Sequence, residues 1–109
     1  MQGSLGEDFA ALRKLRDDDA SGALKEFFGD GEDPREWRRD RAVTLADGRV
    51  TQLSLYECRS LAALPPAICG LAALTRLTLE RCSGLRALPD AISELSALAE
   101  LCLSGCESL

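Results

Sequence analysis

The chain has 109 residues, of which 13 are lysine or arginine and 18 are aspartate or glutamate, so its net charge at neutral pH is −5. The length allows one modest domain. The negative balance, −3 over residues 1–49 and −2 over residues 50–109, argues against a nucleic-acid surface, which needs concentrated positive charge.

The hydropathy pattern indicates neither a secretory signal nor a membrane span. The first ten residues, MQGSLGEDFA, contain no positive cluster followed by an apolar run. No uninterrupted apolar stretch of about 18 residues occurs anywhere in the chain. Five cysteines in such a chain are interpreted as reduced thiols rather than as a disulfide framework. We therefore expect a cytoplasmic protein.

Residues 1–49 contain no repeat, and their pattern begins with two short helices. Ser4 and Glu7 have the spacing of a capping box before the apolar positions that start at Phe9. The three aspartates at residues 17–19 are expected to end this first helix and to cap a second one over residues 20–28. Gly29 is in the position that commonly ends a helix in a left-handed conformation.

A loop over residues 29–34 leads to Trp37 and to a short strand at residues 42–45. Asp47 and Gly48 then predict a hairpin turn into Val50. Trp37 is interpreted as a buried plug rather than a binding residue. The arginines around it alternate with acidic residues, so they are expected to form a solvated mixed-charge face. These arginines are Arg35, Arg38, Arg39 and Arg41.

Residues 50–109 repeat with a period of 24. Residues 50–73 read VTQLSLYECRSLAALPPAICGLAA, residues 74–97 read LTRLTLERCSGLRALPDAISELSA, and residues 98–109 supply half a unit more, LAELCLSGCESL. The columns that recur in all three units are Val50/Leu74/Leu98, Leu53/Leu77/Leu101, Leu55/Leu79/Leu103, Cys58/Cys82/Cys106 and Leu61/Leu85/Leu109. The two complete units add Leu64/Leu88, Pro65/Pro89, Ile68/Ile92 and Leu71/Leu95.

Each unit predicts one strand and one returning segment. Alternating leucines favour a short strand with one buried face, and strands that recur once per unit in the same direction must pair in parallel. After the proline, isoleucine and leucine at a spacing of three predict a short helical or 3₁₀ turn on the opposite side. One coil cannot cover its own leucines, so stacked coils share the core, and residues 1–49 are expected to cap the first coil.

The pattern LxxLxLxxCxxLxxLPxxIxxLxx resembles the leucine-rich repeat over residues 50–109. This variant is similar to the intracellular repeats of plant disease-resistance proteins and of Ras-pathway scaffold proteins. The resemblance implies an α/β fold: a short solenoid with parallel strands on its concave face and helical turns on its convex face. The run from Trp37 through DGRVTQLSL loosely resembles the N-terminal cap of plant and algal leucine-rich-repeat proteins, without that cap's cysteines.

Cys58, Cys82 and Cys106 are interpreted as buried ladder residues rather than as a reactive site. A cysteine at this column is a small, mostly apolar side chain with a weak S–H donor. Adjacent strands lie about 4.8 Å apart, which permits a disulfide by distance, but parallel side chains would make the bridge strained. Three thiols in a straight file do not form the tetrahedral cage of zinc, and without histidine a thiol nucleophile lacks its usual base.

Two further cysteines fall outside this column. Cys69 lies on the convex side, where Ser93 occupies the matching place in the next unit. Cys102 aligns with Ser54 and Thr78 on the outward face of the strands and is expected to be partly exposed. A redox or modification role for these thiols is the alternative to a structural one.

The columns that do not enter the core define the candidate partner-binding site. They are expected to form a shallow polar surface suited to a protein or peptide partner, with no cofactor and no metal. Opposite charges at equivalent positions, Arg76 with Glu100 and Glu57 with Arg81, could instead neutralise each other. The candidate residues are Gln52, Ser54, Tyr56, Glu57, Arg76, Thr78, Glu80, Arg81, Glu100, Cys102 and Ser104.

The sequence therefore predicts a protein–protein interaction module rather than an enzyme. Because the repeat stops at Leu109 in mid-unit, we expect the chain to be part of a longer signalling or immune-type repeat protein. The alternative is the sensing arm of a nucleotide-binding or GTPase protein, whose chemistry would lie elsewhere because no GxxxxGK[ST] motif occurs here.

Overall fold

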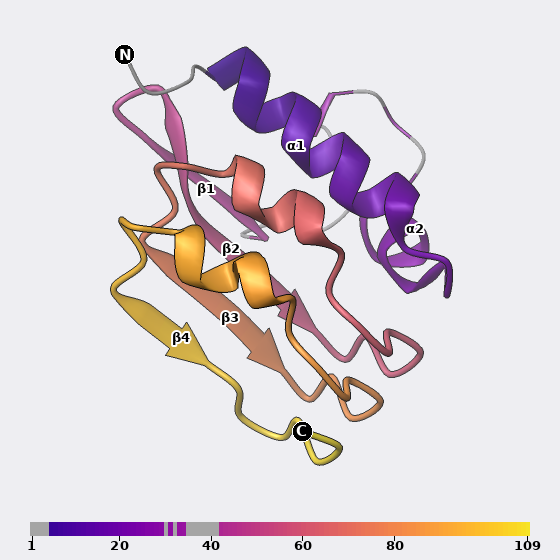
Figure 1. Ribbon diagram of the computed structural model, residues 1–109. Coiled ribbons are helices and arrows are strands. Elements are labelled where there is room, and N and C mark those ends of the chain that lie inside the picture. Colours follow the sequence, from indigo (N-terminus) through magenta and orange to yellow (C-terminus); the bar gives the residue numbers. More distant parts are fainter. Residues whose placement is uncertain (1–4, 30, 32, 35–41) are drawn as a thin grey trace.

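The computed structural model describes residues 5–29, 31, 33–34 and 42–109 (Figure 1). This part of the chain has a mixed α/β fold with two α-helices and a four-stranded sheet in the order β1-β2-β3-β4. Trp37 and the arginine run lie outside the described residues, so the proposed burial of Trp37 stays a prediction. The elements are α1 (Leu5–Asp18), α2 (Ala23–Phe28), β1 (Val43–Ala46), β2 (Arg49–Tyr56), β3 (Arg76–Glu80), β4 (Glu100–Cys102) and the 3₁₀ helices η2 (Pro66–Gly70) and η3 (Asp90–Glu94).

The helices form where the sequence predicts them, but α2 begins three residues later than expected. Gly22 adopts a left-handed conformation (φ 77°), which keeps the preceding turn from joining the helix. Asp19 accepts hydrogen bonds from the backbone N–H of Ser21 at 3.0 Å and of Leu24 at 2.9 Å. The predicted capping role of the aspartate run is therefore confirmed at Asp19.

β1 and β2 form the predicted antiparallel hairpin. Val43 pairs with Leu53 and Ala46 with Arg49. Asp47 and Gly48 both have positive φ angles, 54° and 73°, as the central residues of a type I′ turn require. The hairpin places β1 at one edge of the sheet, beside β2, which is the strand of the first repeat unit.

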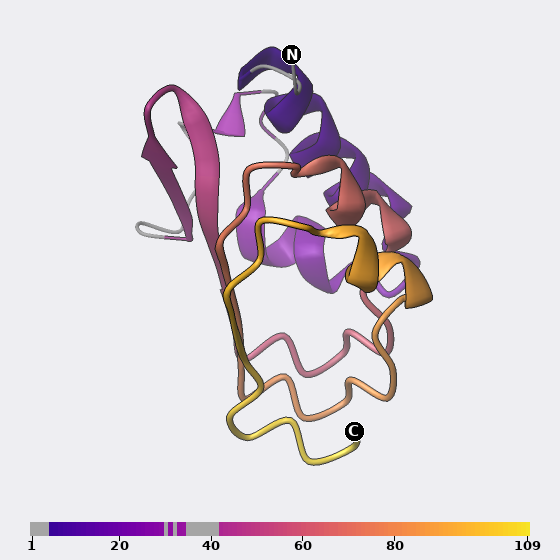
Figure 2. The same cartoon turned by 60° about the vertical axis from the view of Figure 1, so that its left-hand side comes forward.

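β2, β3 and β4 pair in parallel, and their register equals the sequence period. Gln52 pairs with Arg76, which pairs with Glu100, and the leucine column below follows the same 24-residue step. Figure 2 shows that these strands form one layer, while the return segments form a second layer on one side of it.

The second layer is formed by η2, η3 and α1, which run side by side across one face of the sheet (Figure 1). Pro65 and Pro89, in an extended conformation, each precede a 3₁₀ helix, because proline fixes φ and cannot continue an earlier helix. α1 packs closely on η2: a Cβ added to Gly70 would lie 2.8 Å from the Cβ of Ala11.

One apolar core fills the space between the layers. It runs from Phe9 and Leu12 in α1, through the phenylalanines of α2, to the leucine columns of the first two units. The third unit is less covered: Leu77 is fully buried, whereas Leu101 in the same column is 40 % exposed.

Candidate functional site

The outward face of the parallel strands carries the candidate partner-binding residues. Alternation along β2 buries Leu53 and Leu55 and leaves Gln52, Ser54 and Tyr56 partly exposed. The equivalent residues of the other two units are exposed or half-exposed as well. The structure thus brings the predicted residues of all three units to one surface, which we call the strand face.

The centre of the strand face is a row of small polar side chains. Ser54 pairs with Thr78, and Thr78 with Cys102, so two hydroxyls and one thiol follow one another across the sheet. Cys102 is exposed, as the sequence predicts. Such a row forms a shallow floor with hydrogen-bonding groups on which an extended partner could lie.

Charged side chains flank one side of this row. Arg76 makes the predicted ion pair with Glu100, with Nε donating to Oε2 at 2.9 Å and Nη2 donating to Oε1 at 3.0 Å. Both side chains are about half exposed, so the pair contributes little to stability. Because water competes for both charges, a charged group of a partner could replace either member of this ion pair.

The second predicted pair, Glu57 with Arg81, is not the contact that the structure has. Glu57 instead pairs with Arg59, whose Nη2 lies 3.6 Å from Glu57 Oε2. Glu57 and Arg81 each have a left-handed backbone, with φ angles of 58° and 57°, and Gly105 occupies the same position in the third unit with φ 76°. Each chain segment therefore turns sharply at this column, and the side chains of Glu57 and Arg81 do not align across the sheet.

This left-handed column was not recognised from the sequence, although Gly105 was a signal for it. The turn lets backbone pairing continue past the strand ends, since Glu57 N–H donates to Glu80 O at 2.8 Å and Arg81 N–H to Ser104 O at 2.7 Å. Glycine adopts this conformation without steric cost, whereas other residues adopt it only where the surroundings stabilise it.

The three ladder cysteines follow the turn as free thiols. Cys58 and Cys82 are buried as predicted, whereas Cys106 is only partly buried. Cys82 Sγ donates to Leu55 O at 3.8 Å, and Cys106 Sγ donates to Leu79 O at 3.0 Å. Each of these bonds joins a unit to a backbone carbonyl of the unit before it, 27 residues earlier. Cys58 has no such unit before it and donates to Tyr56 O in its own turn at 3.8 Å.

The thiols differ in how their surroundings affect proton loss. Hydrogen bonding from the Cys58 side chain lowers the pKa of Cys82 to about 7, against the opposing effect of burial, and the Cys58 backbone N–H adds to the lowering. Burial raises the pKa of Cys106 and of Cys69. Cys82 is itself fully buried, so its sulfur lies inside the core rather than at a surface open to a substrate.

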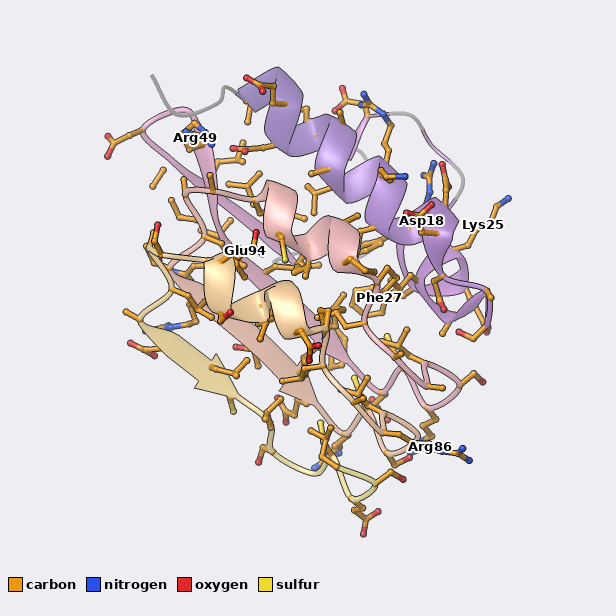
Figure 3. All side chains as sticks on the ribbon, viewed as in Figure 1. Asp18, Lys25, Phe27, Arg49, Arg86 and Glu94 are labelled. Atoms are coloured by element: carbon orange, nitrogen blue, oxygen red, sulfur yellow. The ribbon has the colours of Figure 1, made fainter. Side chains whose placement is uncertain are left out.

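A cavity of about 280 Å³ lies where α2 meets the end of β2. Its apolar wall includes Phe27 and Tyr56, whose rings meet edge to face with centroids 5.0 Å apart. Figure 3 shows Phe27 to the left of α2, on the side of the repeat units. The remaining lining residues are Ala23, Glu26, Glu57, Cys58, Arg59 and Ser60. Sequence reasoning missed this cavity because it joins α2 to a strand end about 30 residues away.

The described residues contain neither a cluster of metal-binding side chains nor a membrane-spanning helix. No group of three or more histidine, cysteine, aspartate or glutamate residues is arranged there to hold a metal ion. No helix within the same residues is both long and apolar enough to cross a membrane.

No family model, curated protein or solved structure matches this chain. Function is therefore inferred from the geometry of the strand face and its surroundings.

Proposed function

We propose that this chain is a leucine-rich-repeat module whose strand face binds a protein or peptide partner. One observation carries the proposal: the parallel strands pair at the 24-residue sequence period, so each variable column forms a row across an open surface. A surface of this kind can change its side chains without disturbing the leucines beneath it.

The repeat identity is supported by the agreement between sequence period and contacts. The strand register, the 3₁₀ helices after Pro65 and Pro89, and the left-handed turns at Glu57 and Arg81 all recur once per unit. The thiol bonds of Cys82 and Cys106 to the preceding unit recur with the same step. We interpret the arrangement as a short solenoid in which residues 1–49 cap the first coil.

The chemistry of the strand face favours a peptide or protein over a small molecule. Its central row of Ser54, Thr78 and Cys102 supplies hydrogen-bonding groups without a deep hollow. Tyr56 and Arg76 stand on either side, and aromatic and arginine side chains are frequent anchors in protein interfaces. The face is small, so we expect a weak or transient complex.

The proposal can be tested by selecting peptides from a displayed random library against the immobilised chain. The binding of selected peptides is then measured with Thr78→Arg, which places a bulky cation in the central row. Ser93→Arg is the matched control, because Ser93 is exposed on η3, on the other layer. We expect at least tenfold weaker binding to T78R and unchanged binding to S93R.

Circular dichroism and thermal unfolding of both variants establish that they remain folded. The proposal is wrong if no peptide is enriched over an unrelated protein, or if the selected peptides bind T78R and the parent chain equally well.

A further inference from the structure

We propose that the cavity between α2 and the end of β2 receives one basic side chain, a lysine or arginine, of the partner bound on the strand face. This inference rests on the proposed function and names the chemistry of that partner. The cavity's size, its apolar wall, its charges and its position support the assignment.

The size of the cavity suits a side chain rather than a whole small molecule. Its volume of about 280 Å³ lies just below the range of about 300–1,000 Å³ that is typical of small-molecule pockets. A single side chain reaching in from an extended partner needs less room than a free ligand, and the remaining contacts would be made along the strand face.

The apolar wall suits a long alkyl stem. Phe27 is almost completely buried, and its ring contacts Tyr56 edge to face at an interplanar angle of 83°. Ala23 completes the apolar lining on the side of α2. Lysine and arginine cover such surfaces with their methylene groups while the charged end stays hydrated.

The charges around the cavity favour a cation over an anion. Glu26 and Glu57 both line it, against one cation, Arg59. Arg59 lies 3.6 Å from Glu57, and both side chains are more than half exposed, so that pair is weak and can exchange. Glu26 has no ion pair within the described residues, which leaves one carboxylate to meet an incoming ammonium or guanidinium group.

Glu80 adds negative charge beside the cavity. It is exposed and pairs in register with Tyr56 on the neighbouring strand. It also has no ion pair in the part of the chain that the structure describes. A chain with a net charge of −5 reinforces this local preference, because its overall field attracts cations.

The position of the cavity connects it to the strand face. Tyr56 is the last residue of β2, two residues beyond Ser54, so the edge of the cavity that Tyr56 forms lies beside the Ser54 end of the central row. An extended partner that crosses the strand ends would therefore pass over the opening.

The direct experiment uses three small probes and backbone amide chemical shifts measured by NMR. Nα-acetyl-lysine-N-methylamide carries the cation, the norleucine analogue keeps a similar stem without charge, and the glutamate analogue carries an anion. We expect the lysine probe to shift the amides of Glu26, Glu57 and Ser60 saturably, and to bind at least fivefold more tightly than either analogue.

The matched variants are Glu26→Gln at the cavity and Glu94→Gln on η3, where Figure 3 shows the Glu94 side chain away from α2. We expect E26Q to weaken binding of the lysine probe at least threefold and E94Q to leave it unchanged. Equal binding of lysine and norleucine probes, preference for the glutamate probe, or equal effects of E26Q and E94Q would each overturn the inference.

A second measurement separates failure of this inference from failure of the proposed function. Peptides selected on the parent chain are expected to carry lysine or arginine at one recurrent position, and substituting that residue by norleucine should remove their sensitivity to E26Q. If selected peptides lose binding to T78R but show no basic preference and no response to E26Q, the strand face binds partners and the cavity does not contribute as proposed.

Discussion

At the scale of single residues, Asp8 joins the helical segment to the sheet. Its carboxylate is fully buried and accepts hydrogen bonds from Arg49 Nε at 2.7 Å, Arg49 Nη2 at 2.9 Å and the backbone N–H of Val50 at 3.0 Å. The hydrogen bond to Asp8 raises the pKa of the Arg49 guanidinium, which therefore stays charged. A buried carboxylate is tolerated here because its charge and its lone pairs are satisfied.

Replacing Asp8 by asparagine should lower the free energy of unfolding by about 2–3 kcal/mol, because it removes the charge that balances Arg49 and breaks charged hydrogen bonds. Urea unfolding followed by circular dichroism measures the change. The matched control is Asp18→Asn, since Asp18 pairs with Lys14 at 3.1 Å on the surface of the same helix (Figure 3). We expect less than about 0.5 kcal/mol from the control, and a similar loss from both variants would contradict the assignment.

The hydrogen bond of Cys58 to Cys82 leads to a second prediction at this scale, on how the stability of the fold depends on pH. The folded pKa of Cys82, about 7, is lower than the value of a free thiol, about 8.5. The unfolded chain therefore binds more protons between these values, and stability should rise as pH increases from 7 toward 8.5. Replacing Cys58 by alanine removes the hydrogen bond and should raise the pKa of Cys82.

Thiolate absorbance near 240 nm, recorded as a function of pH, measures this prediction. The parent chain should show an early titration step of Cys82 near pH 7, and C58A should lack that early step. Cys69→Ala is the control, because Cys69 lies in η2, in the second layer, and its pKa is raised by burial. An early step that survives in C58A would show that another group produces it.

At the scale of elements, the contact between α1 and η2 fixes how the N-terminal helix lies on the repeats. Gly70 and Ala11 permit a close approach, since a Cβ at Gly70 would come within 2.8 Å of the Ala11 Cβ. This distance is shorter than real Cβ contacts allow, so a larger residue at either position would force α1 away from η2. Small residues therefore specify the packing of the second layer.

Replacing Gly70 by alanine should destabilise the chain by about 1–2 kcal/mol through overpacking against Ala11. Ala11→Gly removes the opposing methyl group at the usual helix cost of about 1 kcal/mol. In the double variant the two losses should not add, and the coupling energy should exceed about 0.5 kcal/mol. Chemical denaturation of the four proteins in this cycle measures it.

Ala10→Gly is the matched control for that cycle, because Ala10 is an exposed neighbour on α1 with the same helix propensity. Its loss should add to that of Gly70→Ala without coupling. If the losses of Gly70→Ala and Ala11→Gly also add, α1 moves away from η2 without cost, and the predicted overpacking is wrong.

At the scale of the whole molecule, the burial of the leucine side chains decreases from the first repeat unit to the third. The leucines of β2 and β3 are fully buried, whereas Leu101 is 40 % exposed and Leu109 is 48 % exposed. The N-terminal helices and β1 cover the first unit, and each unit covers the one before it (Figure 2). In a stack whose contacts are mainly between neighbours, stability is expected to follow this order.

Matched truncations in one leucine column test this gradient. Leu77→Ala should cost about 2–5 kcal/mol, because it leaves a cavity between two covered units. Leu101→Ala should cost less than about 1 kcal/mol, because much of that side chain already contacts water. Hydrogen exchange should likewise proceed faster at β4 than at β2. Equal costs for the two substitutions, or faster exchange at β2, would contradict the gradient.

The local features of the fold were predictable from particular residues. Asp47 and Gly48 indicated the hairpin turn, and Pro65 and Pro89 indicated where each return segment begins. The 24-residue period predicted the parallel register, because repeated strands in equivalent environments must pair at equivalent positions. The same period brought the rows of the strand face together.

Features that depend on contacts between distant segments were not predictable from the sequence. The Asp8–Arg49 pair, the approach of Ala11 to Gly70 and the cavity between Glu26 and Tyr56 each join the N-terminal helices to the repeats. Residues 1–49 have no period that could specify their position against the repeat units of residues 50–109. The predicted Glu57–Arg81 pair failed for a related reason, since side-chain direction there depends on a left-handed turn.

The sequence by itself determined which residues are buried in the first two repeat units and which row faces outward, because those properties follow from local alternation repeated at a constant step. Only the tertiary structure decided how α1 and α2 lie against β2 and η2, which charges meet, and where a hollow remains. Those outcomes depend on the shapes of two surfaces that pack together, and a one-dimensional pattern does not encode such complementarity.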